Sequence, residues 1–162
     1  MSERRKIRVL FCCMGNICRS PTAHGVFEGL VAREGLAEWI EVDSAGTHAY
    51  HVGNPPDPRA QETARRRGLD LSAQRARKAL PVDFERFDYV LAMDRDNYRE
   101  LRAICPPGLE RKLALFMDFA PEHELREVPD PYYGGPQGFE QVFDMVEEAA
   151  AGLLEDIRQR LK

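Results

Sequence analysis

The sequence predicts an α/β fold of three layers, a four-stranded parallel sheet with helices on both faces. Three observations support this prediction. Segments typical of strands and helices alternate along the chain, which is the order that βαβ units require. The first strand-like segment is a continuous apolar run, as expected for a parallel strand that is buried on both faces. Two helix-like segments begin with a Ser-Pro or Asp-Pro pair, in which the first residue caps the helix and proline enters its first turn.

The first part of the chain contains two expected strands with a helix between them. The first strand is expected over residues 6–13, which combine Ile, Val, Leu and Phe. The helix is expected to begin at Ser20-Pro21, with Ser20 as its N-cap, because apolar residues recur at helical spacing after this pair. The second strand is expected over residues 39–44, and Gly46 then opens a loop rich in Pro and Gly.

The middle of the chain continues the alternation. A polar helix is expected over residues 57–68, because Asp57-Pro58 repeats the capping pair. The third strand is expected over residues 87–93, FDYVLAM, and a short helix over residues 94–104.

The last part supplies one more strand and one more helix. The fourth strand is expected over residues 111–116. The last helix is expected over residues 139–161, where the apolar residues form one stripe. Residues 118–138 remain as one long irregular stretch, and loops of this length are often functional.

Composition narrows the classes of function. A chain of 162 residues suits one domain, expected over residues 1–162. The net charge of −4 argues against a general nucleic-acid binder, and no apolar run approaches the roughly 20 residues of a membrane span. Clustered cysteines suit a reducing compartment, and a cleaved leader would remove them. We therefore expect a cytoplasmic protein, and a monomer, because each large apolar stripe has a place in the core.

Three of the four cysteines, Cys12, Cys13 and Cys18, lie close together in the sequence. A structural zinc site needs four ligands with spacings such as C-x2-C, and this cluster does not provide them. Thioredoxin-type redox pairs have C-x-x-C spacing, although a disulfide between Cys13 and Cys18 is geometrically feasible in a tight loop. The remaining option is one nucleophilic thiolate with two bystanders.

The position of Cys13 favours a nucleophile. It ends a strand, and the loop after it leads into a helix, so that backbone N–H groups and the helix dipole can hold a tetrahedral oxyanion. The positive potential of these N–H groups and of the helix dipole also favours the thiolate form of Cys13. Arg19 adds a planar bidentate donor. Gly15 permits close approach of the backbone, and Asn16 tolerates the left-handed conformation. The sequence therefore predicts a phosphate-binding loop after the first strand, formed by Met14, Gly15, Asn16, Ile17, Cys18 and Arg19.

The C-x5-R spacing alone does not identify a site, because Cys105 also has an arginine, Arg111, six residues later. Pro106 and Pro107 of this second copy have no N–H to donate. The second copy also runs from a helix end into a strand, which is the reverse chain direction. We therefore expect it to carry no anion site.

A general acid is expected at Asp130. Asp130-Pro131 lies in the long irregular stretch and is followed by Tyr-Tyr-Gly-Gly, which does not sustain a helix. Its carboxylate is therefore not needed as a cap, in contrast to Asp57. A positioned general acid accelerates catalysis by roughly 10²–10⁴-fold.

Several separated motifs resemble one enzyme family. Residues 13–21, CMGNICRSP, resemble the signature of the low-molecular-weight protein tyrosine phosphatases. DSAGT at 43–47, GNPPD at 53–57, AMD at 92–94 and DPYY at 130–133 resemble further motifs of that family in the same order. The resemblance covers nearly the whole chain. It implies a phosphatase that hydrolyses phosphotyrosine through a cysteinyl-phosphate, without metal or other cofactor.

The resemblance also implies roles for particular residues. Cys13 would attack phosphorus, Arg19 and the loop amides would hold the phosphate oxygens, and Asp130 would protonate the departing phenolate. Ser20 would donate a hydrogen bond to the thiolate. The residues implied to brace the loop are Asn16 and Ser44.

Further implied residues concern oxidation and the substrate ring. Cys18 would be a back-up thiol that forms a reversible disulfide with Cys13. A phosphotyrosine ring needs flat partners beside the anion, and the resemblance assigns this wall to Tyr50, Tyr132 and Tyr133. The implied partner is a phosphotyrosine-containing protein or a small aryl phosphate.

Three alternatives remain at this point. Arsenate reductases of this fold need two further downstream cysteines, and this chain has only Cys105. Protein-arginine phosphatases carry Thr where Ile17 stands. A phosphate-binding module without activity would need neither the thiolate nor the acid. One departure from the family is Gln74, which stands near the place of a family histidine and leaves that role open.

Overall fold

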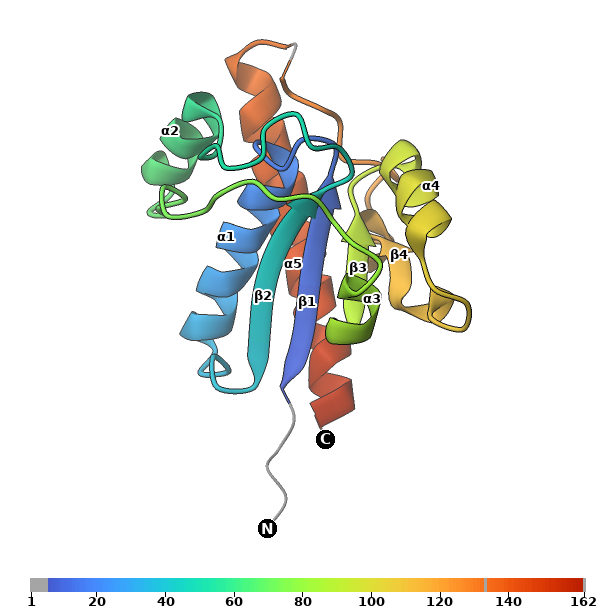
Figure 1. Cartoon of the computed structure of the whole chain (residues 1–162). Helices are drawn as coiled ribbons and strands as arrows, with labels where there is room; N and C mark the ends of the chain where they lie inside the picture. Colours follow the sequence, from blue (N-terminus) through green and yellow to red (C-terminus); the bar gives the residue numbers. More distant parts are fainter. Residues whose placement is uncertain (1–5, 133, 162) are drawn as a thin grey trace.

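The computed structural model describes residues 6–132 and 134–161. Its sheet has four strands, paired in parallel in the order β2-β1-β3-β4 (Figure 1). The strands are β1 (Ile7–Cys13), β2 (Ile40–Gly46), β3 (Tyr89–Ala92) and β4 (Leu113–Leu115). The predicted four-stranded parallel sheet is confirmed.

Helices cover both faces of this sheet. Those on one face are α1 (Arg19–Arg33) and α5 (Pro136–Leu161), and those on the other are α3 (Asp83–Arg86) and α4 (Arg95–Ile104). Side chains of β1 alternate between the two faces, as the period of a strand requires. Val9 and Phe11 pack in the core under α1 and α5, whereas Leu10 and Cys12 pack under α3 and α4. All four are fully buried, which explains the continuous apolar run and confirms the three layers.

The two predicted helix caps differ in outcome. Asp57 caps α2 (Pro58–Arg66), since its carboxylate accepts a hydrogen bond of 2.8 Å from the Arg59 N–H. The prediction for Ser20 was wrong. Helix α1 begins at Arg19, with Cys18 in the cap position and no side-chain cap bond. The hydroxyl of Ser20 lies inside the first turn, where it accepts from Asn16 Nδ2 at 2.8 Å and lies 3.0 Å from Cys13 Sγ.

Several element boundaries differ from the expected ones. Strand β4 is shorter, because 3₁₀ turns, η1 (Glu110–Lys112) and η2 (Phe116–Phe119), form at its two ends. Helix α3 was not predicted, and α5 begins at Pro136 rather than 139. The described residues between 120 and 135 form neither helix nor strand. No helix in the described ranges is long and apolar enough to cross a membrane.

The topology places the candidate site at the carboxyl end of β1. The chain passes from β1 to β2 on one side and reaches β3 on the other, and such a switch point opens a crevice outside the strand ends. Three segments that are distant in sequence meet there: the loop after β1, the loop after β2 and the long loop before α5 (Figure 1). His48 N–H donates to Met14 O at 3.0 Å, and Val128 N–H donates to Met93 O at 2.8 Å.

Candidate active site

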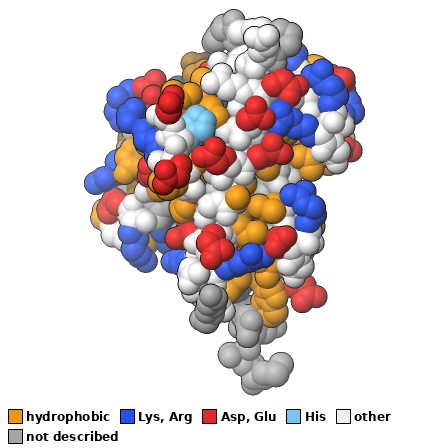
Figure 2. Space-filling model, turned by 180° about the vertical axis from the view of Figure 1, so that it is seen from behind, with side chains coloured by type: hydrophobic (Ala, Val, Ile, Leu, Met, Phe, Trp, Pro, Cys, Tyr) orange, Lys and Arg blue, Asp and Glu red, His pale blue; other side chains and the backbone are white. Residues whose placement is uncertain are grey.

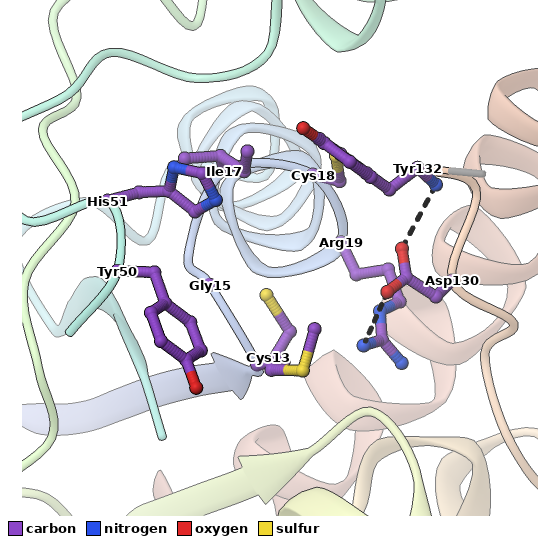
Figure 3. Close-up of a pocket in the computed structure, with 10 residues that line it drawn as sticks. Cys13, Gly15, Ile17, Cys18, Arg19, Tyr50, His51, Asp130 and Tyr132 are labelled. Carbon is purple, nitrogen blue, oxygen red and sulfur yellow. Dashed lines mark hydrogen bonds and ion pairs between the residues drawn. The ribbon is translucent and has the colours of Figure 1, made fainter. Parts of the chain in front are cut away.

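A cavity of about 260 Å³ opens above the end of β1 (Figure 3). It contains most of the residues that the sequence predicted, brought together from three loops. The predicted residues that line it are Cys13, Met14, Gly15, Ile17, Cys18, Arg19, Tyr50, Asp130 and Tyr132. The three residues predicted to support the loop and the thiolate, Asn16, Ser20 and Ser44, are buried beside the loop. Tyr133 lies outside the described residues.

The loop between β1 and α1 surrounds the buried sulfur of Cys13 with backbone N–H groups that can donate hydrogen bonds. Cys13 is 3% exposed at the base of the pocket. Among the described residues, no backbone N–H of residues 15–18 donates a hydrogen bond to another protein group. Backbone donors in this position, at the start of a helix, favour a bound anion.

Asn16 fixes the shape of this loop. It has a φ of 59°, the one positive φ among the described residues other than glycine, and Asn tolerates this conformation. The loop also passes very close to the end of β2, because a Cβ added to Gly46 would lie 2.8 Å from Met14 O and 3.2 Å from Asn16 N. Glycine at position 46 is therefore required for this approach.

The side chain of Asn16 organises the hydrogen bonds under Cys13. Its Oδ1 accepts from Arg77 N–H at 3.0 Å, which orients the amide. Its Nδ2 then donates to Ser20 Oγ at 2.8 Å and to Ser44 Oγ at 3.0 Å. Ser20 Oγ lies 3.0 Å from Cys13 Sγ. Because Ser20 accepts from Asn16, its own proton can be donated to the sulfur at 3.0 Å or to Ala45 O at 3.5 Å, and the sulfur is the nearer acceptor.

Arg19 is held from two sides at the edge of the pocket. Its Nη1 donates to Asp94 Oδ2 at 2.6 Å and to Val128 O at 3.1 Å. Burial by itself would lower the pKa of Arg19, but negative charge on Cys13 and the carboxylates of Asp94 and Asp130 outweighs it and raises the pKa. The Arg19 side chain is 3% exposed, so its guanidinium is a fixed, permanent cation in the site.

Asp130 faces the same guanidinium from the long loop. Its Oδ2 lies 3.7 Å from Arg19 Nη2, and its side chain is 29% exposed. Its Oδ1 accepts from Tyr132 N–H at 3.0 Å. Since Val128 is bonded to both Arg19 and Met93, the loop that carries Asp130 is anchored two residues before the carboxylate.

Comparisons with known proteins agree with this geometry. A family model described as "Low molecular weight phosphotyrosine protein phosphatase" matches residues 8–162. A protein of that name from Schizosaccharomyces pombe is 42% identical over 154 residues, which are 94% of this chain and 98% of that protein. This chain belongs to the low molecular weight phosphotyrosine protein phosphatase family.

Solved structures of similar sequence have the same fold. A crystal structure of a protein tyrosine phosphatase from Entamoeba histolytica, with Hepes in its active site, has a TM-score of 0.93 at 39% identity, covering 97% of this chain and 100% of that chain. A structure of a Drosophila arginine phosphatase has a TM-score of 0.86 at 32% identity, covering 93% and 98%. Two substrate classes therefore occur on this fold, and the substrate has to be argued from the site.

The other two clustered cysteines differ from Cys13 in their surroundings. Burial raises the pKa of the Cys12 thiol well above its usual value, and Cys12 faces the opposite side of the sheet. Burial also raises the pKa of the Cys18 thiol strongly, and the carboxylate of Asp57 adds to the increase. Both thiols therefore remain protonated at neutral pH. Cys13, which lies in the pocket 3.0 Å from Ser20 Oγ, is therefore the candidate nucleophile among the three clustered cysteines.

Gln74, which stands near the place of a family histidine, is hydrogen-bonded to the residues around Ser44. Gln74 Oε1 accepts from Ser44 Oγ at 3.5 Å, and its Nε2 donates to Pro21 O at 3.1 Å. His24 of α1 approaches the same Ser44 hydroxyl at 3.4 Å and pairs with Glu28 at 3.4 Å. Besides Asn16, Ser44 therefore has polar neighbours on α1 and in the segment between α2 and α3.

The tyrosines predicted as a wall lie at the mouth of the pocket. Tyr50 is 76% exposed and its ring stacks on His48, with centroids 5.3 Å apart. Tyr132 is 39% exposed and has the Arg59 guanidinium 5.3 Å from its centroid. Across the pocket from Tyr132 lies His51 (Figure 3).

Two site residues were missed by the sequence interpretation. Asp94, the N-cap of α4, holds Arg19, and the AMD motif that contains it was a signal that could have identified it. His51 lines the pocket, and its place beside Tyr50 in the same loop was the available signal. Among the described residues, no three His, Cys, Asp or Glu side chains are grouped so that they could hold a metal ion.

Proposed function

We propose that this chain hydrolyses phosphotyrosine and other aryl phosphomonoesters through a cysteinyl-phosphate, without metal. The observation that carries the proposal is the convergence of three groups on one cavity: the sulfur of Cys13, the guanidinium of Arg19 and the carboxylate of Asp130. Phosphoryl transfer depends mainly on positioning and on stabilising the charge of the oxygens. Family membership supports the same activity.

In the first step the thiolate of Cys13 attacks phosphorus. A sulfur–phosphorus bond forms while the bond from phosphorus to the aryl oxygen breaks. The protonated carboxyl of Asp130 gives its proton to the departing oxygen, which leaves as a phenol. Arg19 and the backbone N–H groups of residues 14–19 hold the equatorial oxygens, where charge stabilisation lowers the barrier most.

In the second step water hydrolyses the intermediate. The carboxylate of Asp130, formed in the first step, takes a proton from the attacking water. The new phosphorus–oxygen bond replaces the sulfur–phosphorus bond, so inorganic phosphate leaves and Cys13 returns as a thiolate. No redox change and no further reactant besides water is needed.

The neighbouring residues have supporting roles in this proposal. Ser20 donates a hydrogen bond to the thiolate, and Asn16 and Ser44 hold the loop in shape. Tyr50 and Tyr132, which line the pocket, form the wall beside the substrate ring, and the family resemblance assigns Tyr133, outside the described residues, to the same wall. Cys18 serves as the back-up thiol that can form a disulfide with Cys13 under oxidation.

We also propose the setting in which the enzyme acts. Residues 1–162 form a single phosphatase domain that works as a cytoplasmic monomer, on a phosphotyrosine-containing protein or a small aryl phosphate. Acidic and basic side chains are interspersed on the face seen in Figure 2, and the net charge is −4. These features support an enzyme that does not bind nucleic acid.

The proposal is tested by phosphate release from a phosphotyrosine peptide in buffer that contains a metal chelator. Wild type is expected to be active at any chelator concentration, and Asp130→Ala to lose about 10²-fold in kcat on this substrate. On p-nitrophenyl phosphate the loss is expected to be smaller, because nitrophenolate leaves readily without a proton. Activity that chelator abolishes, or equal losses on both substrates, would contradict the mechanism.

Parallel assays separate the alternatives. Arginine phosphate and arsenate are offered to the same preparation under the same conditions. Turnover of either at a higher kcat/KM than the phosphotyrosine peptide would replace the proposed substrate. Binding of phosphate without turnover of any of the three would indicate a module without activity.

A further inference from the structure

Four polar residues at intervals of four form a row that enters α1. Asn16 lies in the phosphate loop, and Ser20, His24 and Glu28 follow in the helix. Positions i and i+4 are neighbours on one face of a helix, so the three helical side chains lie one turn apart on the same face. Asn16 Nδ2 donates to Ser20 Oγ at 2.8 Å, and His24 Nε2 lies 3.4 Å from Glu28 Oε2. The row therefore leads from the loop around the sulfur to the exposed carboxylate of Glu28.

Ser44 of β2 bridges the two halves of this row. Helix α1 packs beside β2 (Figure 1), and the row faces the Ser44 hydroxyl. Ser44 Oγ accepts from Asn16 Nδ2 at 3.0 Å and lies 3.4 Å from His24 Nδ1. Asn16 in turn donates to Ser20, whose Oγ lies 3.0 Å from Cys13 Sγ. A continuous series of side-chain contacts therefore joins the imidazole to the sulfur.

The imidazole of His24 is oriented by Glu28. The His24 side chain is 13% exposed. Because a carboxylate only accepts hydrogen bonds, the Nε2 atom that faces Glu28 is assigned a proton. This hydrogen bond lowers the pKa of the Glu28 carboxyl, although burial acts in the opposite direction. With Nε2 held in this way, the other ring nitrogen, Nδ1, is directed to Ser44.

The Ser44 hydroxyl has one proton and two possible acceptors for it. One is Nδ1 of a neutral His24 ring, and the other is Gln74 Oε1 at 3.5 Å. Both distances exceed the usual range of roughly 2.7–3.2 Å, as expected when one hydroxyl serves two partners. If the ring gains a proton, Nδ1–H donates to Ser44 Oγ and the hydroxyl proton turns to Gln74. In both charge states of His24, one lone pair of Ser44 is left for Asn16.

The other charged groups beside the ring are engaged elsewhere. Asp43 and Arg75 line, together with His24, a cavity of about 330 Å³ between α1, β2 and the segment before α3. Asp43 is paired with Arg77 at 3.2 Å, and Arg75 donates to two backbone carbonyls at 2.7 Å. The open space beside the imidazole also accommodates a different side chain at position 24 without overpacking.

We propose that His24 is a positioning residue for the nucleophile Cys13. Its imidazole holds the Ser44 hydroxyl with a lone pair towards Asn16, which orients Ser20 against the sulfur. A hydrogen bond to the charged form of a thiol favours that form, so this arrangement supports the thiolate. The inference rests on the proposed function, because it names a residue that supports the proposed nucleophile without touching the substrate.

The test compares three replacements of His24 that place polar atoms differently. Asn carries its polar atoms on Cγ, as the ring carries Nδ1, whereas Gln carries them one carbon further out, at the distance of Nε2. Leu has none. Alkylation of Cys13 by iodoacetamide is measured against pH by peptide mass spectrometry in the wild type and the variants His24→Asn, His24→Gln and His24→Leu.

The expected result is a shift of the pH at which alkylation is half-maximal. His24→Leu and His24→Gln are expected to raise this pH by about 0.4–1 unit, which corresponds to the loss of one hydrogen bond. Alkylation below this pH then slows by about 2.5- to 10-fold. His24→Asn is expected to stay within about 0.2 unit of the wild type. Arg19 and Asp130, the charged groups beside the sulfur in the pocket, are the same in every variant.

The order of the three variants separates positioning from a structural role. Leu and Gln are better helix formers than Asn. If His24 only stabilised α1, His24→Asn would be the most damaging change, whereas the proposal expects it to be the least damaging. Urea unfolding of the same variants measures their stability independently.

A second background tests whether His24 acts through Ser44. In Ser44→Ala the series of contacts is already interrupted, so His24→Leu is expected to cause no further shift. The proposal is overturned if His24→Leu alkylates as the wild type does, or if His24→Asn shifts as far as His24→Leu. It is also overturned if the shifts of His24→Leu and Ser44→Ala add in the double variant.

Alkylation requires no turnover, so this test is separate from that of the proposed function. If the wild type does not hydrolyse phosphotyrosine but the three variants follow the expected order, the catalytic proposal fails and the positioning role stands. If hydrolysis occurs but the order is absent, the catalytic proposal stands and the assignment of His24 fails.

Discussion

Cys13 and Arg19 are separated by five residues, and so are Cys105 and Arg111. In the first pair the arginine is buried and bonded to Asp94 and Val128, and the cysteine lies under the loop between them. In the second pair Arg111 is exposed and its Nη1 donates to Gly108 O at 2.6 Å. The Cys105 thiol points to Pro106 O at 3.4 Å.

The difference follows from the direction of the chain. The first pair runs from a strand into the start of α1, where backbone N–H groups lack helical partners. The second pair runs from the end of α4 towards β4, and helix ends offer carbonyl oxygens instead. Its Gly108 N–H is already bonded to the Glu110 carboxylate, at 2.9 and 3.1 Å. The same spacing of residues therefore gives an anion site only where unbonded N–H groups converge.

The largest expected difference between the pairs concerns the two sulfurs. Cys13→Ser is expected to lower kcat for p-nitrophenyl phosphate by more than about 10⁴-fold, because a serine hydroxyl is not ionised by the loop. Cys105→Ser is expected to stay within twofold of the wild type. Steady-state assays of both variants measure this, and a Cys13→Ser enzyme with substantial turnover would refute the nucleophile.

The second difference concerns the two arginines. Arg19→Lys is expected to lower kcat/KM by about 10³-fold, because an ammonium cannot hold Asp94 and also present two parallel donors to phosphate. Arg111→Lys is expected to leave kcat/KM unchanged, since its side chain is exposed and donates to the nearby carbonyl of Gly108. Competitive inhibition by inorganic phosphate should weaken in the first variant alone. Equal kinetics in both variants would contradict the role of Arg19.

The third difference is the rate of alkylation of the two thiols by iodoacetamide. Burial and the neighbouring Glu110 raise the pKa of the Cys105 thiol, so at neutral pH it stays protonated and becomes reactive only as the pH rises. Cys13 is expected to be labelled at least about tenfold faster at pH 7, because a thiolate under backbone donors is the reactive form. Peptide mass spectrometry measures both sites. Inorganic phosphate should slow the alkylation of Cys13 and leave that of Cys105 unaffected. Faster alkylation of Cys105 than of Cys13 would contradict this prediction.

The fold was predictable because its signals are local. The apolar run of β1 and the Asp57-Pro58 cap each depend on a few neighbouring residues, and the structure has both. Ser20 shows the limit of local reasoning, since the same hydroxyl can cap a helix or bond to Cys13, and the contact with Asn16 decides between them. Helix α3 is too short, at four residues, to show a helical period.

The site was predictable where side-chain chemistry and spacing are in one segment, as in residues 13–19. The contacts that hold Arg19 were not, because Asp94 and Val128 are 75 and 109 residues away in the sequence. The acceptor at Val128 is a backbone carbonyl, which no residue type identifies. His51 was missed because a lone histidine in a Gly-containing loop has no spacing that relates it to Tyr132.

The smallest expected difference compares the positive-φ residue of the first C-x5-R segment with that of the second. Asn16 has a φ of 59° and Gly108 a φ of 89°. Gly108→Ala is expected to lower the free energy of unfolding by about 1 kcal/mol through backbone strain alone, since nothing lies within 4 Å of the added Cβ, and to leave kcat unchanged. Asn16→Ala adds the loss of three side-chain hydrogen bonds, so about 2–4 kcal/mol and a tenfold decrease in kcat are expected.

Asn16→Gly separates the two contributions to this last effect. Glycine relieves the backbone strain but does not restore the lost hydrogen bonds. Asn16→Gly should therefore be about 1 kcal/mol more stable than Asn16→Ala and have the same reduced kcat. Urea unfolding gives the stabilities and p-nitrophenyl phosphate hydrolysis gives kcat. If Asn16→Gly restores both, the bonds from Asn16 to Ser20 and Ser44 do not position the sulfur. The two copies of the spacing would then differ in backbone direction and in their arginines, but not in a braced loop.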